Sequence, residues 1–268
     1  MKKCIITIYA LLASLLILGT FVDYELTKVL YAENSPFGAF MAWFIYIPTF
    51  FMAYFSLFVI DRPLIRSKIP YKYVTLGLLF LFYMILTYIF LELFIYTDSL
   101  VTIGILVGIN AIAMVLTLLI PKDALYTFQK LALLYLVVLT LGYGIVSILK
   151  FLWGRERFYL LESPSDFSLW FIPQGIESGT RYNSFPSGHA TAAAMTLIFV
   201  FIPLMFDSLK KYFVPVSIGV GFYIILGMLS RMMYGRHYLT DTVFSVLIVL
   251  SLFIYFYKVI HPNEEEIV

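Results

Sequence analysis

The sequence predicts an all-α fold, a polytopic membrane helical bundle of about eight spans. Hydrophobic residues make up 62% of the chain and charged residues 13%, whereas a soluble domain carries about 25% charged residues. The apolar residues gather in runs of about 20, the length that a helix needs to cross the hydrocarbon core of a bilayer. A soluble core could not enclose this much apolar surface.

The first half of the chain contains four expected spans. The first, 4–22, follows Met-Lys-Lys and is interpreted as an uncleaved signal anchor, because no small-x-small cleavage site closes it. Residues 23–39 are more polar, and we expect a loop with a short surface helix there. The next spans are expected at 40–60, 73–95 and 100–120.

The second half contains the other four spans, expected at 131–149, 188–206, 213–229 and 242–257. Residues 150–187 form the longest stretch without a span, and their tryptophans and phenylalanines are typical of a loop at a membrane interface. The tail, 261–268, is acidic. No internal repeat or soluble second domain is found.

The distribution of basic residues predicts the orientation. With a cytoplasmic N-terminus, most of the 18 lysines and arginines fall in inner segments, as the positive-inside rule requires. Almost all the others gather in two outer segments, 150–187 and 230–241. These are Lys150, Arg155, Arg157, Arg181, Arg231 and Arg236. Because the rule works against cations at these places, we expect them to have a function.

Several classes of function are disfavoured. No basic tract suited to nucleic acid occurs, so no nucleic-acid partner is expected. The one cysteine, Cys4, excludes an intrachain disulfide. No cluster of His, Cys and carboxylate residues has the spacing of a metal site. The sequence does not predict an oligomeric state.

The stretch from Ser230 to Asp241 carries the first candidate residues for catalysis. His237 and Asp241 are four residues apart, so in a helix that starts near His237 they share one face. A carboxylate there can hold one imidazole nitrogen as N–H and leave the other as a nucleophile. Arg231 lies across a turn at Gly235 and offers a planar fork for phosphate oxygens. The alternative is a satisfied polar pair without a catalytic role.

Two further stretches fit the same chemistry. In Pro186-Ser187-Gly188-His189, the serine is a good N-cap and the glycine allows a ligand close to the backbone. Free amides at a helix start bind anions, and His189 could protonate a leaving oxygen. Alone, this stretch could be an ordinary capped helix, and the pair Lys150 and Arg157 could be snorkelling interface residues. Together the three stretches supply what phosphoryl transfer needs: cations, a nucleophile and an acid.

These three stretches resemble the signature motifs of the type 2 phosphatidic acid phosphatase / vanadium haloperoxidase superfamily, in its bacterial integral-membrane lipid phosphatase branch. The resemblance covers about residues 100–260 and rests on the order, the spacing and the residue types. It implies a phosphohistidine on His237, oriented by Asp241, with His189 as general acid and with no metal or cofactor. The implied phosphate-binding residues are Lys150, Arg157, Ser187, Gly188 and Arg231. One departure is Phe158, where the family usually has proline.

The expected function is that of a lipid phosphatase in the cell membrane, with its active site on the extracytoplasmic face. It would hydrolyse a lipid phosphomonoester or diphosphate; the motifs do not select the lipid. The expected domains are a transmembrane extension at 1–99, a phosphatase core at 100–260 and a cytoplasmic tail at 261–268. One alternative is a phosphotransferase with the same intermediate, and another is a non-enzymatic carrier or flippase. A haloperoxidase is disfavoured because the family's peroxidases are soluble.

Overall fold

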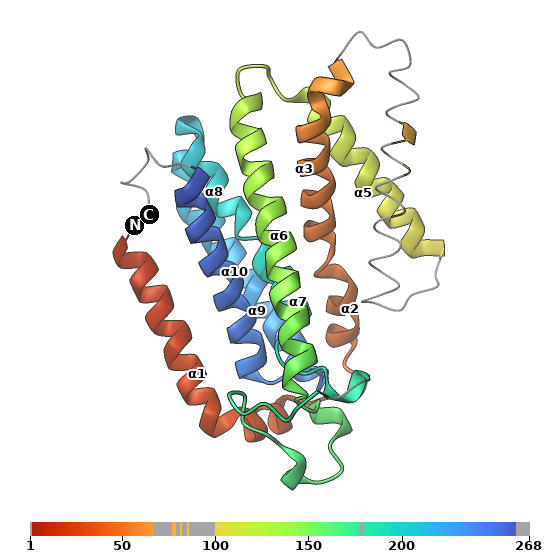
Figure 1. The fold of residues 1–268 in the computed structure, drawn as a ribbon, viewed down its shortest axis with the longest axis vertical. Helices are drawn as coiled ribbons and strands as arrows, with labels where there is room; N and C mark the ends of the chain where they lie inside the picture. Colours follow the sequence, from red (N-terminus) through yellow and green to blue (C-terminus); the bar gives the residue numbers. More distant parts are fainter. Residues whose placement is uncertain are drawn as a thin grey trace. The chain divides into compact units, whose positions relative to one another are not determined.

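The computed structural model describes residues 2–66, 77–78, 81, 85, 100–176 and 179–260. Over these residues the regular structure is helical and contains no strand (Figure 1). The α-helices are α1 (Lys2–Leu30), α2 (Pro36–Phe44), α3 (Ile47–Arg66), α5 (Leu100–Leu119), α6 (Leu125–Trp153), α7 (Gly188–Met195), α8 (Ile198–Met205), α9 (Phe213–Met233) and α10 (Leu239–Ile260). Short 3-10 helices are η1 (Phe158–Leu160), η2 (Pro164–Asp166), η3 (Thr180–Tyr182) and η4 (Asp207–Tyr212).

Six helical stretches in the described part are long and apolar enough to cross a membrane. They are Lys2–Leu30, Pro36–Arg62, Leu125–Leu160, Gly188–Met205, Asp207–Met233 and Leu239–Ile260. The predicted all-α polytopic class is therefore confirmed, and the total of eight spans stays a prediction. Helix α5 coincides with the expected span at 100–120. Most of the expected span at 73–95, and the acidic tail at 261–268, lie outside the described residues.

The prediction of a loop at 23–39 is wrong for residues 23–30, because α1 continues to Leu30. No glycine or proline occurs between Gly19 and Pro36, so the backbone has no reason to leave the helix where the apolar run ends. A drop in hydrophobicity marks the edge of the lipid and not the end of the helix. The short helix α2 begins within the same segment, and the Oγ of its N-cap Ser35 accepts from the Gly38 amide at 3.0 Å.

The helices divide into two compact units. Unit 1 contains residues 1–46 and 137–268, and unit 2 contains residues 47–136. In unit 1, α1 runs antiparallel to α10, since the Tyr9 hydroxyl lies 2.9 Å from the Ser251 hydroxyl and Asp23 binds Thr240. Helix α7 packs against α9 and α10, and its alanines are fully buried. Alanine side chains allow such close packing around a short central helix.

Unit 2 is built mainly from α3 and α5. Its core includes Tyr54, Phe58 and Ala113. The Tyr135 hydroxyl donates to the Thr49 carbonyl at 2.8 Å. None of the predicted site residues lies in this unit. The domain boundary expected at residue 99 stays a prediction.

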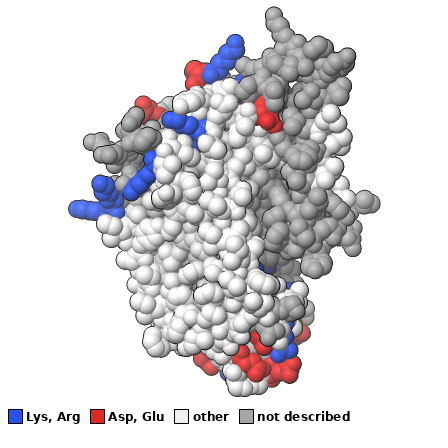
Figure 2. All heavy atoms as spheres, in the orientation of Figure 1, with Lys and Arg blue, Asp and Glu red and all other residues white. Residues whose placement is uncertain are grey.

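The surface of unit 1 agrees with a membrane location. In Figure 2, most Lys, Arg, Asp and Glu side chains lie toward the margins of the view, and the broad surface between them is uncharged. Many large apolar side chains of α1 and α9 are exposed, among them Phe21 at 80% and Ile218 at 67%. Such a surface is stable against lipid and would be costly in water.

Candidate active site

His237 lies in the turn between α9 and α10. Gly235 makes this turn with φ of 64°, and a Cβ there would lie 2.7 Å from the Tyr31 ring and 2.9 Å from Tyr159. The Nδ1 atom of His237 lies 2.6 Å from the Ser184 carbonyl oxygen. A carbonyl only accepts, so Nδ1 carries the hydrogen and Nε2 keeps its lone pair. The turn thus holds the tautomer that a nucleophile needs.

The charge state of His237 follows from its surroundings. Burial is the main cause that lowers the pKa of His237 to about 3, while Asp241 raises it and Lys150 and Arg157 lower it. The imidazole is therefore neutral around pH 7. A neutral ring with a free Nε2 lone pair is the reactive form of a histidine nucleophile.

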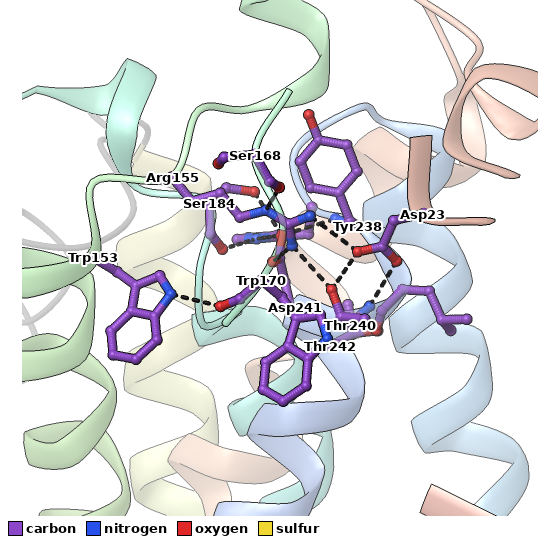
Figure 3. Close-up of polar contacts among 12 residues, drawn as sticks. Asp23, Trp153, Arg155, Ser168, Trp170, Ser184, Tyr238, Thr240, Asp241 and Thr242 are labelled. Carbon is purple, nitrogen blue, oxygen red and sulfur yellow. Dashed lines mark hydrogen bonds and ion pairs between the residues drawn. The ribbon is translucent and has the colours of Figure 1, made fainter. Parts of the chain in front are cut away.

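Asp241 occupies the first turn of α10. The positive end of the helix dipole stabilises a carboxylate at this place. Its oxygens accept from the Ser184 hydroxyl at 2.6 Å, the Tyr238 amide at 2.8 Å and the Arg155 guanidinium at 2.5 Å (Figure 3). The distance to His237 Nδ1 is 3.7 Å, beyond a hydrogen bond. Asp241 therefore acts on His237 through its charge and through Ser184, whose hydroxyl it binds and whose carbonyl orients the ring.

The start of α7 lies beside this pair, as the sequence predicts. Ser187 caps the helix, since its Oγ accepts from the Ala190 amide at 3.2 Å, and its own amide donates to the Asp241 carbonyl at 3.1 Å. The His189 ring centroid lies 6.5 Å from that of His237. At Gly188, a Cβ would meet nothing within 4 Å among the described residues. Packing thus leaves open space beside the Cα of Gly188.

The predicted phosphate-binding cations approach the site from three elements. Lys150 donates to the Asn183 carbonyl at 2.7 Å. Asn183 is the residue before Ser184, whose carbonyl orients His237. The Nε of Arg157 is buried and makes no hydrogen bond within the described residues. Arg231 is 1% exposed and donates to the Ser230 hydroxyl at 3.3 Å and to the Gly38 carbonyl. Phosphate binding by these residues stays a prediction.

Phe158, which stands where the family usually has proline, takes part in an aromatic cluster. Its ring centroid lies 5.7 Å from that of Tyr24, 5.4 Å from Tyr31 and 6.3 Å from Tyr238. Two backbone bonds fix the loop around it, from the Arg157 amide to the Arg181 carbonyl at 3.0 Å and from the Tyr159 amide to the Gly235 carbonyl at 3.2 Å. The loop that carries Arg157 is therefore ordered without proline.

Sequence reasoning missed Asp23, Arg155 and Ser184 as parts of this site. Asp23 lies in the part of α1 where the sequence predicts a loop, and from the sequence Arg155 is only one of six cations in the outer segments. Both are buried and bind each other at 3.0 Å. A signal was present for Asp23, because the helical pattern continues beyond the apolar run without a breaker.

A metal ion in a protein is held by several His, Cys or carboxylate side chains that the structure brings together. The residues that it describes contain no group of three or more His, Cys, Asp or Glu side chains that could hold a metal ion. The expectation that the reaction needs no metal remains a prediction.

The chain matches the model of a known protein family. The model of a family described as the PAP2 superfamily matches residues 131–265. The matched segment contains all the predicted site residues, from Lys150 to Asp241. No curated protein and no solved structure matches the chain.

Proposed function

Because the chain belongs to the PAP2 superfamily, we propose that it is an integral-membrane lipid phosphatase with a phosphohistidine intermediate. The substrate would be a lipid phosphomonoester or the terminal phosphate of a lipid diphosphate. The observation that carries this proposal is the hydrogen bond from His237 Nδ1 to the Ser184 carbonyl at 2.6 Å. It leaves Nε2 of a neutral, buried ring as the nucleophile.

The first chemical step transfers the phosphoryl group to His237. The Nε2 lone pair attacks phosphorus in line, and the bond between phosphorus and the lipid oxygen breaks with its electron pair on the oxygen. Protonated His189 then gives its proton to that oxygen. The ring of His237 becomes cationic, which the nearby charge of Asp241 favours at 3.7 Å.

The second step releases phosphate. His189, now neutral, takes a proton from a water that attacks phosphorus, and the P–N bond breaks with its electrons returned to Nε2. Lys150, Arg157 and Arg231 would neutralise the phosphoryl oxygens in both steps, together with the amides at the start of α7. In this scheme the chain's own cations take the place of a metal, so no metal or other cofactor is required.

The location of the reaction belongs to the same proposal. The positive-inside distribution favours a chain in the cell membrane with the site on the extracytoplasmic face. The site is built from the ends of five helices. These are the C-terminal ends of α1, α6 and α9 and the N-terminal ends of α7 and α10. If each expected span crosses the membrane, alternation would put these ends on one side of it.

Phosphate release by the purified protein tests the function. The assay compares phosphatidate, phosphatidylglycerophosphate, undecaprenyl diphosphate and a lipid A phosphate, in EDTA and with vanadate. We expect turnover of at least one lipid in EDTA and its inhibition by vanadate, which takes the five-coordinate geometry of the transition state. In water labelled with oxygen-18, a phosphatase puts the label into the released phosphate. Activity lost in EDTA and restored by magnesium would contradict the proposed chemistry, and phosphate transferred to a lipid or sugar acceptor would indicate a phosphotransferase.

A further inference from the structure

Asp23 is a carboxylate of the N-terminal helix that lies within the polar network of the active site (Figure 3). It is 2% exposed. Its Oδ1 accepts from the Thr240 amide at 3.1 Å, and its Oδ2 accepts from Arg155 at 3.0 Å and from the Thr240 hydroxyl. Every one of these partners is a donor, which is the pattern of an ionised carboxylate. The Thr240 amide is one of the free amides at the start of α10, so Asp23 caps the helix that carries Asp241.

Arg155 joins Asp23 to Asp241. One terminal nitrogen of its guanidinium donates to Asp241 at 2.5 Å and to the Thr240 hydroxyl at 2.9 Å, while the other donates to Asp23 at 3.0 Å. Its Nε donates to the Ser168 carbonyl at 3.0 Å. The group also lies 4.2 Å from the centroid of the Tyr238 ring. Each nitrogen of the Arg155 guanidinium thus has a partner within the protein, and one face lies over an aromatic ring. A cation that binds substrate would instead keep donors free.

The charges of this network do not cancel. Two carboxylates share one guanidinium, and all three groups are at most 2% exposed. Removing charges from water costs several kcal/mol per ion, and apolar residues of similar volume would often be at least as stable. Asp241 of this network lies 3.7 Å from Nδ1 of His237, the ring that becomes cationic when it takes a phosphoryl group. Stability alone therefore gives no reason for this arrangement, whereas catalysis does.

We propose that Asp23 and Arg155 are positioning residues of the active site, which act on His237 through Asp241. Asp23 holds Arg155 and the first turn of α10, Arg155 holds Asp241, and Asp241 holds Ser184, whose carbonyl orients the nucleophile. The N-terminal helix then supplies part of the catalytic apparatus from outside the segment matched by the family model, 131–265. This inference rests on the proposed function, because it needs His237 as the nucleophile.

A double-mutant cycle on hydrolysis of an aryl phosphate tests the coupling. The variants are Asp23→Asn, Asp241→Asn and both together, each compared with the wild type for kcat and KM. We expect Asp23→Asn to lower kcat by about 10-fold and to change KM by less than about twofold. In the Asp241→Asn background the same substitution should cost less than about twofold, because residues that act in one chain are not additive.

Glu162→Gln is the matched control. Glu162 is one of two carboxylates on Arg181, as Asp23 is on Arg155, but its side chain is 79% exposed in the loop. This substitution should leave kcat unchanged. If Asp23→Asn does not accumulate in the membrane, Asp23→Glu takes its place; it keeps the charge, displaces it by one methylene and should lower kcat in the same non-additive way.

Additive losses in the cycle, or a kcat of Asp23→Asn equal to that of the wild type, would overturn the inference. A loss in Asp23→Asn that appears in KM and not in kcat would do the same. His237→Ala separates the two proposals. If the wild type turns over and His237→Ala does not, an unchanged Asp23→Asn variant refutes the positioning role alone. If His237→Ala is as active as the wild type, the proposed function itself fails.

Discussion

At the scale of single residues, the two histidines of the site have different surroundings and hence different expected roles. His237 is fixed by the Ser184 carbonyl at 2.6 Å, whereas His189 is half-buried with its ring 5.0 Å from that of Tyr46. The pairing of a fixed nucleophile with a second imidazole suits attack by the first and proton transfer by the second. Substitution can separate these tasks.

His237→Ala should lower kcat by about 1,000-fold or more on every substrate, because no covalent intermediate can form. In kcat/KM, which reports the steps up to release of the leaving group, His189→Ala should cost about 100-fold or more on a lipid phosphate, whose alkoxide needs a proton, but less than about 10-fold on an aryl phosphate. The loss of activity in Asp241→Asn should lie between the losses in His189→Ala and His237→Ala. Steady-state kinetics on one lipid and one aryl phosphate, with expression checked, decides this. Equal losses of His189→Ala on both substrates would contradict its role as general acid.

The low pKa of His237, about 3, gives a second prediction at this scale. The chain has three histidines, so the double variant His189→Gln, His261→Gln leaves His237 alone for histidine-selective NMR. We expect no titration of its ring between pH 8 and 5. Because the folded pKa lies below the ordinary value of about 6.5, the unfolded chain binds the proton more readily. Stability contributed by the neutral ring is thus present above about pH 6.5 and is lost as the pH falls toward 3. A titration midpoint near 6.5 would contradict the buried, neutral ring.

Residue patterns identified most candidate site residues but not the network that supports them. His237, Asp241, Ser187 and His189 could be proposed because a motif keeps them close in sequence. Asp23 and Arg155 are 132 residues apart, and nothing in a local pattern indicates that two such residues meet. The bond from Ser184 to His237 also depends on the path of a loop, which hydrophobicity does not determine.

At the scale of elements, the approach of α1 to α10 decides whether Asp23 reaches the site. Gly19 lies one turn before Asp23, and a Cβ there would lie 2.5 Å from the Thr240 side chain and 3.1 Å from Asp23. Glycine therefore allows the two helices to lie in close contact. The sequence could predict both helices from their apolar runs, but the closeness of the pair depends on this three-dimensional contact.

Gly19→Ala should force α1 away from α10 or displace Thr240. We expect a loss of about 1–3 kcal/mol of stability, as for other overpacked sites, and a lower kcat. Gly219→Ala is the control, because a Cβ at Gly219 in α9 would meet nothing within 4 Å of the described residues, and alanine favours a helix. Thermal unfolding and aryl phosphate turnover measure both effects. If the two variants behave alike, the close approach of α1 is not needed.

At the scale of the whole molecule, composition was sufficient for the class but not for the extent of each helix. The apolar runs predicted a polytopic helical membrane protein, and the described helices confirm it. The apolar runs could not show that α1 continues beyond Val22 to Leu30. Polar residues at the membrane interface are compatible with a helix as well as with a loop. The division into units 1 and 2 depends on packing, which no run of sequence reveals.

The orientation in the membrane is a prediction for the whole chain. Cys4 is the one cysteine and is exposed, so a Cys4→Ser background allows labelling of single introduced cysteines. Ser165→Cys in the outer loop should react with an impermeant maleimide in intact cells, and Ser208→Cys should react only after permeabilisation. Both serines are exposed, which makes them a matched pair. The reverse pattern would place the active site on the cytoplasmic face.

A phosphoryl group on His237 is the defining intermediate of the proposed reaction, and it can be trapped. His189→Ala with an aryl phosphate should form the phosphoenzyme but release it slowly, since the base that activates water is missing. The reaction is quenched in alkali, where phosphohistidine is stable, and the peptide that contains His237 is analysed by mass spectrometry. We expect phosphate on His237 in this variant and none when His237→Ala is added. Phosphate on a serine or threonine, or turnover of the wild type without any phosphoenzyme, would contradict it.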